Sequence, residues 1–443
     1  MISYFPQAMN LRESESLYER ALIAIGGGVT SAARRSPAGN PVYMERGSGP
    51  HLWDVDGNRY IDFALGFGTC LLGHAAACVR EAVHVQLDRA LSFGGGHRHE
   101  VEASELLVSL IPNAEQCLFS STGTDAVLAA VRIARAVTGR AMIIKMEGSY
   151  HGSSDALFVN VWPDVTAGDL GANPAVHPES EGMSPGTAAD VLVAPYNDLA
   201  AVEQLLTARG DEIACVVVEP VQSMSGCIGP VPGYLEGLRA ATRKSGSLLI
   251  FDEVITGFRL ALGGGQQFFG VDADLATFGK AMAGGMPLSA VAGSRDVMEP
   301  ASSYRVHHAG TFNGNPLACA AGVAAMTYFR DNAAALYPRI HELGERLAAG
   351  WREVSPRLSV RGVGPMQYLS VGEPAAGVRS IRDLHGGDYQ GYLLLARQLL
   401  RHGVHLLAAK GLCYVSACHE ESDIDAAVAA LAEALAELPE QDR

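Results

Sequence analysis

Four lysines supply all the side-chain primary amines of this 443-residue chain: Lys145, Lys244, Lys280 and Lys410. A lysine amine attacks a carbonyl group and forms a Schiff base once it loses its proton, and an apolar setting lowers its pKa. Lys280 follows the apolar run LATF and precedes AMAGGMP, with no acidic neighbour in sequence. Lys244 ends an expected helix, and Lys410 lies in a late turn. Lys280 is therefore the favoured nucleophile rather than a surface lysine, and Lys145, after the run AMII, is its serious rival.

Acidic side chains follow two other apolar runs. Glu219 comes after ACVVV, and Asp252 and Glu253 come after SLLIF. A carboxylate at the end of a buried strand is costly unless a cationic group meets it. Such acids could bind Mg²⁺, could serve a protonated ring nitrogen, or could cap the next helix, and their spacing leaves all three roles open.

Small hydroxyl residues lead from the run CLF into an expected helix, AVLAAVRIARA. The sequence there is SSTGTD, which contains Thr122, Gly123 and Thr124. This pattern is typical both of a phosphate site at a helix N-terminus and of an ordinary helix cap. It is not a Walker loop, because no Gly-Lys-Ser/Thr follows. An aromatic residue, Tyr150, comes soon after AMII and could stack on a flat ring or pack locally, and Thr311 lies in a Gly/Asn/Pro turn.

These features are more specific together than singly. A phosphate site, a buried aspartate, a nucleophilic lysine and a stacking aromatic are the parts that a pyridoxal phosphate enzyme needs. Asp252 would keep the pyridine nitrogen protonated, and Lys280 would hold the aldehyde and then move a proton. We therefore expect pyridoxal 5'-phosphate as cofactor and no metal.

The expected elements place these residues at one edge of a sheet. Between residues 100 and 310, short apolar runs alternate with amphipathic helices, which predicts an α/β fold with a buried, mostly parallel sheet. Ligands bind such sheets at the carboxyl ends of their strands. The segment HLWDVDGNRYIDF predicts a hairpin, and the C-terminal part predicts a helix over 332–354, short strands and a final helix from Ser422. We expect an N-terminal arm and part of a small domain (1–75), a large domain (76–330) and a C-terminal small domain (331–443).

The composition of the chain argues against nucleic acid and membranes as partners. The net charge is −15, whereas nucleic acid or an acidic membrane surface would favour a basic patch. The chain has no apolar run of the about 20 residues that a membrane span needs, and its N-terminus does not resemble a signal peptide. The cysteines are scattered without a C-x-x-C pair. We expect a cytoplasmic protein with small-molecule partners.

The order of motifs resembles the class-III aminotransferases over nearly the whole chain. The motifs are STGTDA, YHG, VEPV, LLIFDEVITGFR, TFGKAMAGGMP and GTFNGNPLA. The resemblance implies a pyridoxal phosphate enzyme of fold type I, usually a homodimer with the active site at the subunit interface. Within the family the chain looks most like the branch that holds glutamate-1-semialdehyde aminomutase and the D- and β-amino acid aminotransferases.

The resemblance also assigns roles around the cofactor ring. Lys280 matches the Schiff-base lysine and Asp252 the partner of the pyridinium nitrogen. Tyr150 matches the ring-stacking aromatic, Glu219 matches an acid that lines the pocket, and Val254 falls among the cofactor-binding residues.

Further matches concern the phosphate and the substrate. Thr122, Gly123 and Thr124 match the phosphate loop, and Thr311 matches a threonine that reaches the phosphate of the neighbouring subunit. Arg34 falls where this branch places an arginine that binds the substrate carboxylate.

One departure bears on the reaction. The aminomutases have an asparagine after Glu-Pro-Val that reaches the phenolic oxygen of the cofactor, and Met224 occupies the matching position. Methionine cannot donate that hydrogen bond. The resemblance therefore implies an aminotransferase that passes an amino group from an amino acid or amine to an oxo acid, with the aminomutase as the alternative.

Overall fold

The computed structural model describes residues 9–35, 41–163, 171–184, 186–374, 376–384, 386–407 and 410–438. The chain forms two compact units. The small unit comprises Met1–Ala76, Pro338–Ala376 and Gly386–Arg443, and the large unit comprises Ala77–Tyr337 and Gly377–His385. Both ends of the chain therefore build the small unit. Its boundary with the large unit falls inside a helix, at Pro338 rather than at residue 331, and a short late segment returns to the large unit.

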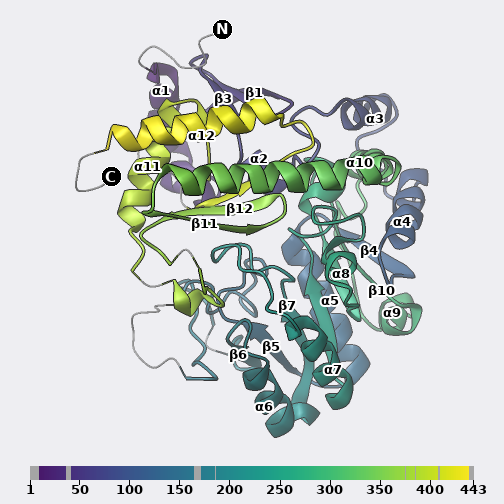
Figure 1. The fold of residues 1–443 in the computed structure, drawn as a ribbon. Helices are drawn as coiled ribbons and strands as arrows, with labels where there is room; N and C mark the ends of the chain where they lie inside the picture. Colours follow the sequence, from purple (N-terminus) through teal and green to yellow (C-terminus); the bar gives the residue numbers. More distant parts are fainter. Residues whose placement is uncertain are drawn as a thin grey trace. The chain divides into compact units, whose positions relative to one another are not determined.

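A seven-stranded sheet forms the centre of the large unit, with the strand order β4-β10-β9-β8-β7-β5-β6 (Figure 1). Only β10 runs antiparallel to its neighbours, so the prediction of a mostly parallel sheet is confirmed. The strands are β4 (Gln116–Ser120), β5 (Met142–Met146), β6 (Val191–Ala194), β7 (Ile213–Val218), β8 (Leu248–Asp252), β9 (Leu275–Phe278) and β10 (Ser289–Gly293).

These strands are apolar on both faces because helices cover the sheet. Helix α5 (Gly123–Thr138) packs its apolar side on side chains of β5, β7, β8, β9 and β10 to form one core cluster. The other helices of this unit are α3 (Ala77–Leu87), α4 (Arg98–Leu110), α6 (Leu199–Arg209), α7 (Tyr234–Ser245), α8 (Gly264–Phe269) and α9 (Arg295–Ser302). Short 3₁₀ turns lie at η3 (Gly210–Glu212), η4 (Lys280–Ala283) and η5 (Ile381–Asp383).

The longest helix, α10 (Pro316–Val354), begins 16 residues before the predicted start at residue 332. The side-chain oxygen of Asn315 accepts hydrogen bonds from the backbone N–H groups of Leu317 and Ala318, at 3.0 and 3.2 Å. This is an N-cap, followed by proline at the first helical position and by an alanine-rich stretch of high helix propensity. The apolar run 316–329 therefore continues directly into the predicted helix.

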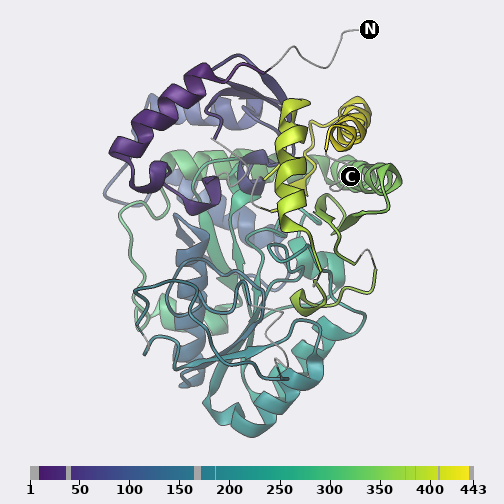
Figure 2. The same cartoon turned by 90° about the vertical axis from the view of Figure 1, so that its left-hand side faces the viewer.

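The small unit contains two sheets, β1-β2-β3-β13 and β11-β12-β14. The predicted hairpin is confirmed, since β2 (His51–Asp54) and β3 (Arg59–Asp62) pair antiparallel around a turn. Side chains from α10, α11 (Tyr389–Arg401), α12 (Glu421–Ala436) and the strands form one core. Figure 2 views α12 nearly end-on and shows α11 crossing it. The remaining elements are α1 (Arg12–Ala24), η1 (Gly26–Gly28), η2 (Ala32–Arg34), α2 (Leu65–Gly68), β1 (Met44–Ser48), β11 (Leu358–Val363), β12 (Met366–Val371), β13 (Val404–His405) and β14 (Leu412–Tyr414). Among the described helices, none combines the length and the apolar composition that crossing a bilayer requires.

Candidate active site

Four segments that leave the carboxyl ends of neighbouring strands are buried except at one residue each. The segments are 142–152 from β5, 213–228 from β7, 249–260 from β8 and 275–283 from β9, and their single partly exposed residues are Tyr150, Met224, Val254 and Lys280. The four strands are adjacent in the order β9-β8-β7-β5. All four segments leave the sheet at its carboxyl edge, which is where parallel sheets bind ligands, so these four residues are the candidates for contact with a ligand there.

Lys280 stands immediately after β9, in the first position of the turn η4. Its φ of 43° is a left-handed conformation, which is strained for a residue with a side chain and is commonest at functional sites. Burial of the ammonium, and next the charge of Arg259, lower the pKa of Lys280 to about 8. A substantial fraction of this amine is therefore unprotonated near neutral pH, as a nucleophile requires.

Asp252, the last residue of β8, has both carboxylate oxygens engaged by the protein. Oδ2 lies 2.8 Å from Nδ1 of His151, and Oδ1 accepts hydrogen bonds from Thr277 Oγ1 (3.2 Å) and the N–H of Val254 (3.1 Å). Burial lowers the pKa of His151, so its imidazole is neutral and Nδ1–H donates to the carboxylate. Nε2 of His151 has no hydrogen-bond partner among the described residues.

Glu219 follows β7 and is buried between two loops. Its carboxyl accepts hydrogen bonds from the backbone N–H of Tyr150 at 3.1 Å and of Ser223 at 3.2 Å. Burial, and next the charge of Asp252, raise the pKa of Glu219 to about 8. The structure thus joins the predicted residues Tyr150 and Glu219 directly, with Asp252 close enough to act on both electrostatically.

The N-terminus of α5 lies beside Val254. A Cβ built on Gly123 would lie 3.1 Å from both methyl carbons of Val254, and one built on Gly279 would lie 3.4 Å from the nearer methyl. Thr122 caps the helix, since its Oγ1 accepts the N–H of Asp125 at 3.3 Å. The cap role is therefore confirmed. It uses the N–H of Asp125, and the N–H groups of Gly123 and Thr124 at the start of the helix stay available to an anion.

Thr124 packs against the loop after β5. Gly152 there has a φ of 89°, and a Cβ at this position would lie 2.8 Å from Cα of Thr124. The Oγ1 of Thr124 accepts the N–H of Ser153 at 3.3 Å. Only a glycine fits this approach, which holds the YHG loop against the N-terminus of α5.

Lys145, the alternative candidate for the nucleophile, uses its amine to bind the protein's own backbone. Its side chain is fully buried, and Nζ donates hydrogen bonds to the carbonyl oxygens of Ser149 (2.9 Å), Leu157 (3.3 Å) and Val159. Burial lowers the pKa of Lys145 to about 7, but three carbonyl oxygens around Nζ favour the ammonium form, whose three donors they occupy. Lys145 therefore does not present its amine to a ligand.

Glu253, the acid next to Asp252, serves the protein itself. It accepts hydrogen bonds from Thr256 Oγ1 (2.7 Å) and from the N–H groups of Gly265 (2.6 Å) and Gln266 (2.9 Å), at the N-terminus of α8. Of the three roles left open for the acids, capping thus applies to Glu253. Among the residues that the structure describes, no group of three or more His, Cys, Asp or Glu side chains is arranged to hold a metal ion.

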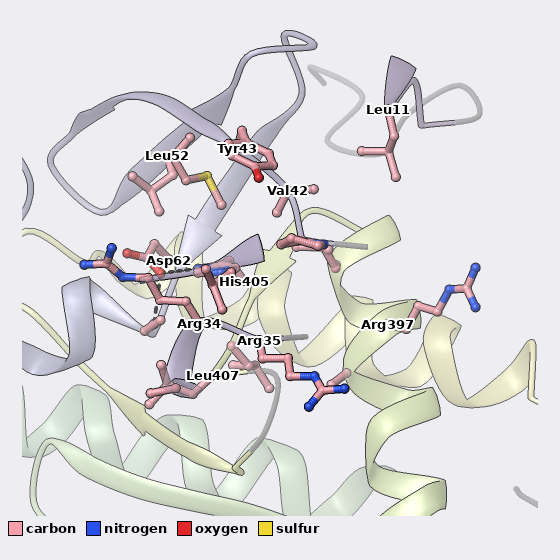
Figure 3. Close-up of a pocket in the computed structure, with 18 of the residues that line it drawn as sticks. Leu11, Arg34, Arg35, Val42, Tyr43, Leu52, Asp62, Arg397, His405 and Leu407 are labelled. Atoms are coloured by element: carbon pink, nitrogen blue, oxygen red, sulfur yellow. Dashed lines mark hydrogen bonds and ion pairs between the residues drawn. The ribbon is translucent and has the colours of Figure 1, made fainter. Parts of the chain in front are cut away.

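Two predicted residues lie apart from this group. Thr311 is exposed in the turn before α10, next to Phe312, which is 63% exposed. Arg34 belongs to the small unit, where Nη1 donates to Thr30 Oγ1 at 3.2 Å. Figure 3 shows Arg34 and Arg35 on the wall of a cavity of about 1000 Å³ in that unit, together with the hydrogen-bonded pair Asp62 and His405. The roles of Thr311 and Arg34 stay predictions.

Sequence reasoning missed His151, which contacts Asp252 across 101 positions in the chain. The available signal was its place in Tyr150-His151-Gly152, directly after a residue that was already singled out. A histidine in a loop after a buried strand, with a buried acid nearby in the sheet, is a natural hydrogen-bond partner for that acid.

Solved structures of known proteins share the fold of this chain. An omega-transaminase from Sphaerobacter thermophilus superposes with a TM-score of 0.90 at 32% identity, covering 97% of this chain and 99% of that one. A β-phenylalanine aminotransferase from Variovorax paradoxus gives 0.83 at 32% identity, covering 95% and 93%. The fold is thus that of a type I pyridoxal phosphate enzyme.

The sequence comparisons give the family. Residues 32–435 match the class-III aminotransferase model. A glutamate-1-semialdehyde 2,1-aminomutase from Chloroflexus aggregans is 40% identical over 96% of this chain and 98% of its own length, and one from Methanothrix thermoacetophila is 40% identical over 94% and 95%. The chain belongs to the class-III aminotransferases, and its cofactor is pyridoxal phosphate.

The residues present fit this cofactor. The glycines at 123 and 152 bring backbone close to Val254 and Thr124, where a larger residue would collide. The hydroxyl of Ser120, just before the helix cap, is buried without a hydrogen-bond partner among the described residues. A phosphate near the N-terminus of α5 is an anion of the kind that such a helix end accepts.

Proposed function

We propose that this protein is an aminotransferase that moves an amino group between an amino acid or an amine and an oxo acid by ping-pong chemistry. The observation that carries the proposal is that four buried segments after neighbouring strands each have one partly exposed residue, namely Tyr150, Met224, Val254 and Lys280. Lys280 supplies the amine, Val254 and Met224 supply apolar surface, and Tyr150 supplies an aromatic face. This combination suits a flat ring bound over a reactive lysine.

The cofactor supplies an electrophilic aldehyde and a ring that withdraws electrons from the carbon bonded to the amino nitrogen. Lys280 would hold the aldehyde through Nζ and, when the substrate amine displaces it, would move the proton as general base and acid. Its lowered pKa, about 8, is close to working pH, where proton transfer in both directions is efficient.

Asp252 would hold the protonated ring nitrogen through its carboxylate. His151 fixes one oxygen of this carboxylate, and the N–H of Val254 and the hydroxyl of Thr277 fix the other. A carboxylate held by three donors keeps its position as the charge of the ring changes. The phosphate would lie at Thr122, Gly123 and Thr124, and Glu219 would line the pocket below Tyr150.

Met224 favours the aminotransferase over the aminomutase. It is the one partly exposed residue of the segment 213–228, and it cannot donate the hydrogen bond of the aminomutase asparagine. The 40% identity to proteins named glutamate-1-semialdehyde aminomutase supports the second candidate, an intramolecular transfer on that substrate.

A homodimer would complete the site. The exposed turn that carries Thr311 and Phe312 is suited to a partner surface, and Thr311 would then reach the phosphate of the other subunit. Arg34 would bind the substrate carboxylate, because a guanidinium pairs with a carboxylate through two parallel hydrogen bonds. In a protein of net charge −15, an anionic substrate needs such a specific cation.

A donor panel tests the proposal. The purified holoenzyme is mixed with single amines and with α-, β- and D-amino acids, and the cofactor spectrum and the released oxo product are recorded. An aminotransferase converts its cofactor to the aminated form and releases the oxo product without any acceptor present. Absence of both signals with every donor, together with conversion of glutamate 1-semialdehyde to 5-aminolevulinate, would establish the aminomutase instead.

A further inference from the structure

We propose that Lys145 is a positioning residue for the reaction: its buried side chain fixes the loop 149–159 and thereby sets where Tyr150 meets the cofactor and where His151 meets Asp252. The inference rests on the proposed function of these two residues. Lys145 is the penultimate residue of β5, so it stands on the sheet itself, and its three hydrogen-bond acceptors all belong to this one loop.

The peptide unit between Ser149 and Tyr150 is held from both sides. Its carbonyl oxygen accepts a hydrogen bond from Nζ of Lys145 at 2.9 Å, and its N–H donates to Oε1 of Glu219 at 3.1 Å. Rotation of this peptide plane would break both bonds at once. Because the plane leads directly into Tyr150, the direction in which that side chain leaves the backbone is fixed by a cation on β5 and a carboxyl after β7.

The far side of the loop is held by the same ammonium. The carbonyls of Leu157 and Val159 lie 8 and 10 residues beyond Ser149, and Nζ draws them to one point. The residues between, which include His151, therefore form a closed loop with a common anchor. Closing the loop restricts the backbone on which His151 meets Asp252.

The rest of the loop's surroundings reinforce this anchor. Nε2 of Gln222 donates to the backbone oxygen of Glu147 (2.6 Å) and to Ser149 Oγ (3.1 Å), and the N–H of Gly148 donates to the backbone oxygen of Asn160 (2.8 Å). These hydrogen bonds hold the ends of the loop, and none of them involves the carbonyl of Ser149 or the N–H of Tyr150. Lys145 alone, among the described side chains, bonds carbonyls on both arms of the loop.

Replacement of Lys145 by methionine tests the idea, with Lys244→Met as the matched control at the end of α7. Methionine keeps most of the side-chain volume and removes all three donors. We expect kcat to fall about 10²-fold, as for a misplacement near 1 Å at the site, with a smaller rise in KM and a measurable loss of affinity for pyridoxal phosphate. Lys244→Met should change each of these by no more than about twofold, as a surface substitution does.

Hydrogen exchange separates positioning from general stability. In Lys145→Met the amides of residues 149–152 should exchange faster while the amides of β7 and β8 stay protected. Equal loss of protection over the whole large unit would overturn the proposal, and so would unchanged cofactor affinity. Both readouts are independent of amino transfer, so they stand apart from any failure of the proposed function.

A double-mutant cycle gives a second check. If Lys145 acts through Tyr150, the loss of cofactor affinity caused by Lys145→Met should shrink in a Tyr150→Ala background. Additive losses would contradict the proposal. Should the methionine variant fail to fold, Lys145→Gln, which keeps two donors, replaces it. If neither folds, exchange in the unaltered holoenzyme decides: the Tyr150 amide must be as protected as the amides of β5, and faster exchange overturns the idea.

Discussion

The carboxylate of Asp252 and the imidazole of His151 lie 2.8 Å apart, although one ends β8 and the other follows β5, with β7 between them in the sheet. The contact is buried, and Nδ1–H of the neutral histidine donates to Oδ2. The loop after β5 therefore reaches across a strand to hold the acid that would face the cofactor ring.

Loss of this contact should weaken both the fold and cofactor binding. In His151→Leu the buried carboxylate loses one of its three donors, which costs about 1–3 kcal/mol. Urea unfolding of the apoprotein measures this cost, and titration with pyridoxal phosphate measures affinity. His151→Asn, whose side-chain N–H can replace Nδ1–H, should recover part of both. Equal behaviour of the two variants would argue that the hydrogen bond itself contributes nothing.

Removal of the Lys280 amine should abolish the visible absorbance that the cofactor has when it is bound to this amine. Lys280→Ala leaves no primary amine exposed at the sheet edge, since Lys145 is enclosed by carbonyls. We expect amino transfer to fall about 10²- to 10⁴-fold, the usual contribution of a positioned acid–base group. Absorbance spectroscopy and donor turnover provide the measurements, with Lys244→Ala as the control. An unchanged spectrum in Lys280→Ala would refute the assignment.

The pH dependence of cofactor capture should report the lowered pKa of Lys280. The neutral amine is the reactive form, so the rate at which the apoprotein captures pyridoxal phosphate should rise with pH and level off above about 8. The ordinary lysine pKa of about 10.4 would move the plateau more than two units higher. Because the folded pKa lies below the unfolded one, this group adds stability as pH rises between about 8 and 10, where the unfolded chain binds more protons.

Gly152 should be intolerant of a side chain for reasons of space. Alanine there would place Cβ 2.8 Å from Cα of Thr124, and the φ of 89° adds backbone strain. Gly139, the C-cap of α5, has a φ of 70° and nothing within 4 Å of a built Cβ, so Gly139→Ala carries the strain without the collision. We expect Gly152→Ala to lower cofactor affinity far more than Gly139→Ala. Equal losses in equilibrium titrations would show that strain alone matters.

Mixed dimers should reveal whether Thr311 serves the partner subunit. Lys280→Ala removes the amine of its own site, and Thr311→Ala would weaken the phosphate contact of the other site. A dimer with one subunit of each kind would contain one complete site. Random exchange of equal amounts makes about half of the dimers mixed, so mixing the two variants should recover cofactor affinity at about a quarter of all sites. Light scattering checks the dimer itself. A monomeric protein, or no recovery on mixing, would reject the shared site.

The sequence predicted the positions of Lys280 and Asp252 because strand ends in a parallel sheet meet at one edge, and apolar runs mark the strands. It did not predict the contact of His151 with Asp252 or the three carbonyl oxygens around Nζ of Lys145. Both depend on how the loop after β5 folds back over other strands. The predicted start of α10 lies too late for a local reason, since Asn315 caps the helix in a Gly/Asn/Pro segment whose composition is typical of a turn. Long-range loop contacts of this kind have no periodicity for a sequence pattern to reveal.

The four partly exposed residues at the carboxyl edge of the sheet also bear on how the substrate range of such a site can evolve. Residues on either side of Tyr150, Met224, Val254 and Lys280 are packed in the interior, so changes there would disturb the fold. Met224 is partly exposed, so its replacement removes little core packing, whereas the methyl carbons of Val254 lie close to Gly123 and Gly279. Substrate range can therefore drift through Met224 without a matching loss of stability, and a small library at this position would be the economical place to redirect this enzyme.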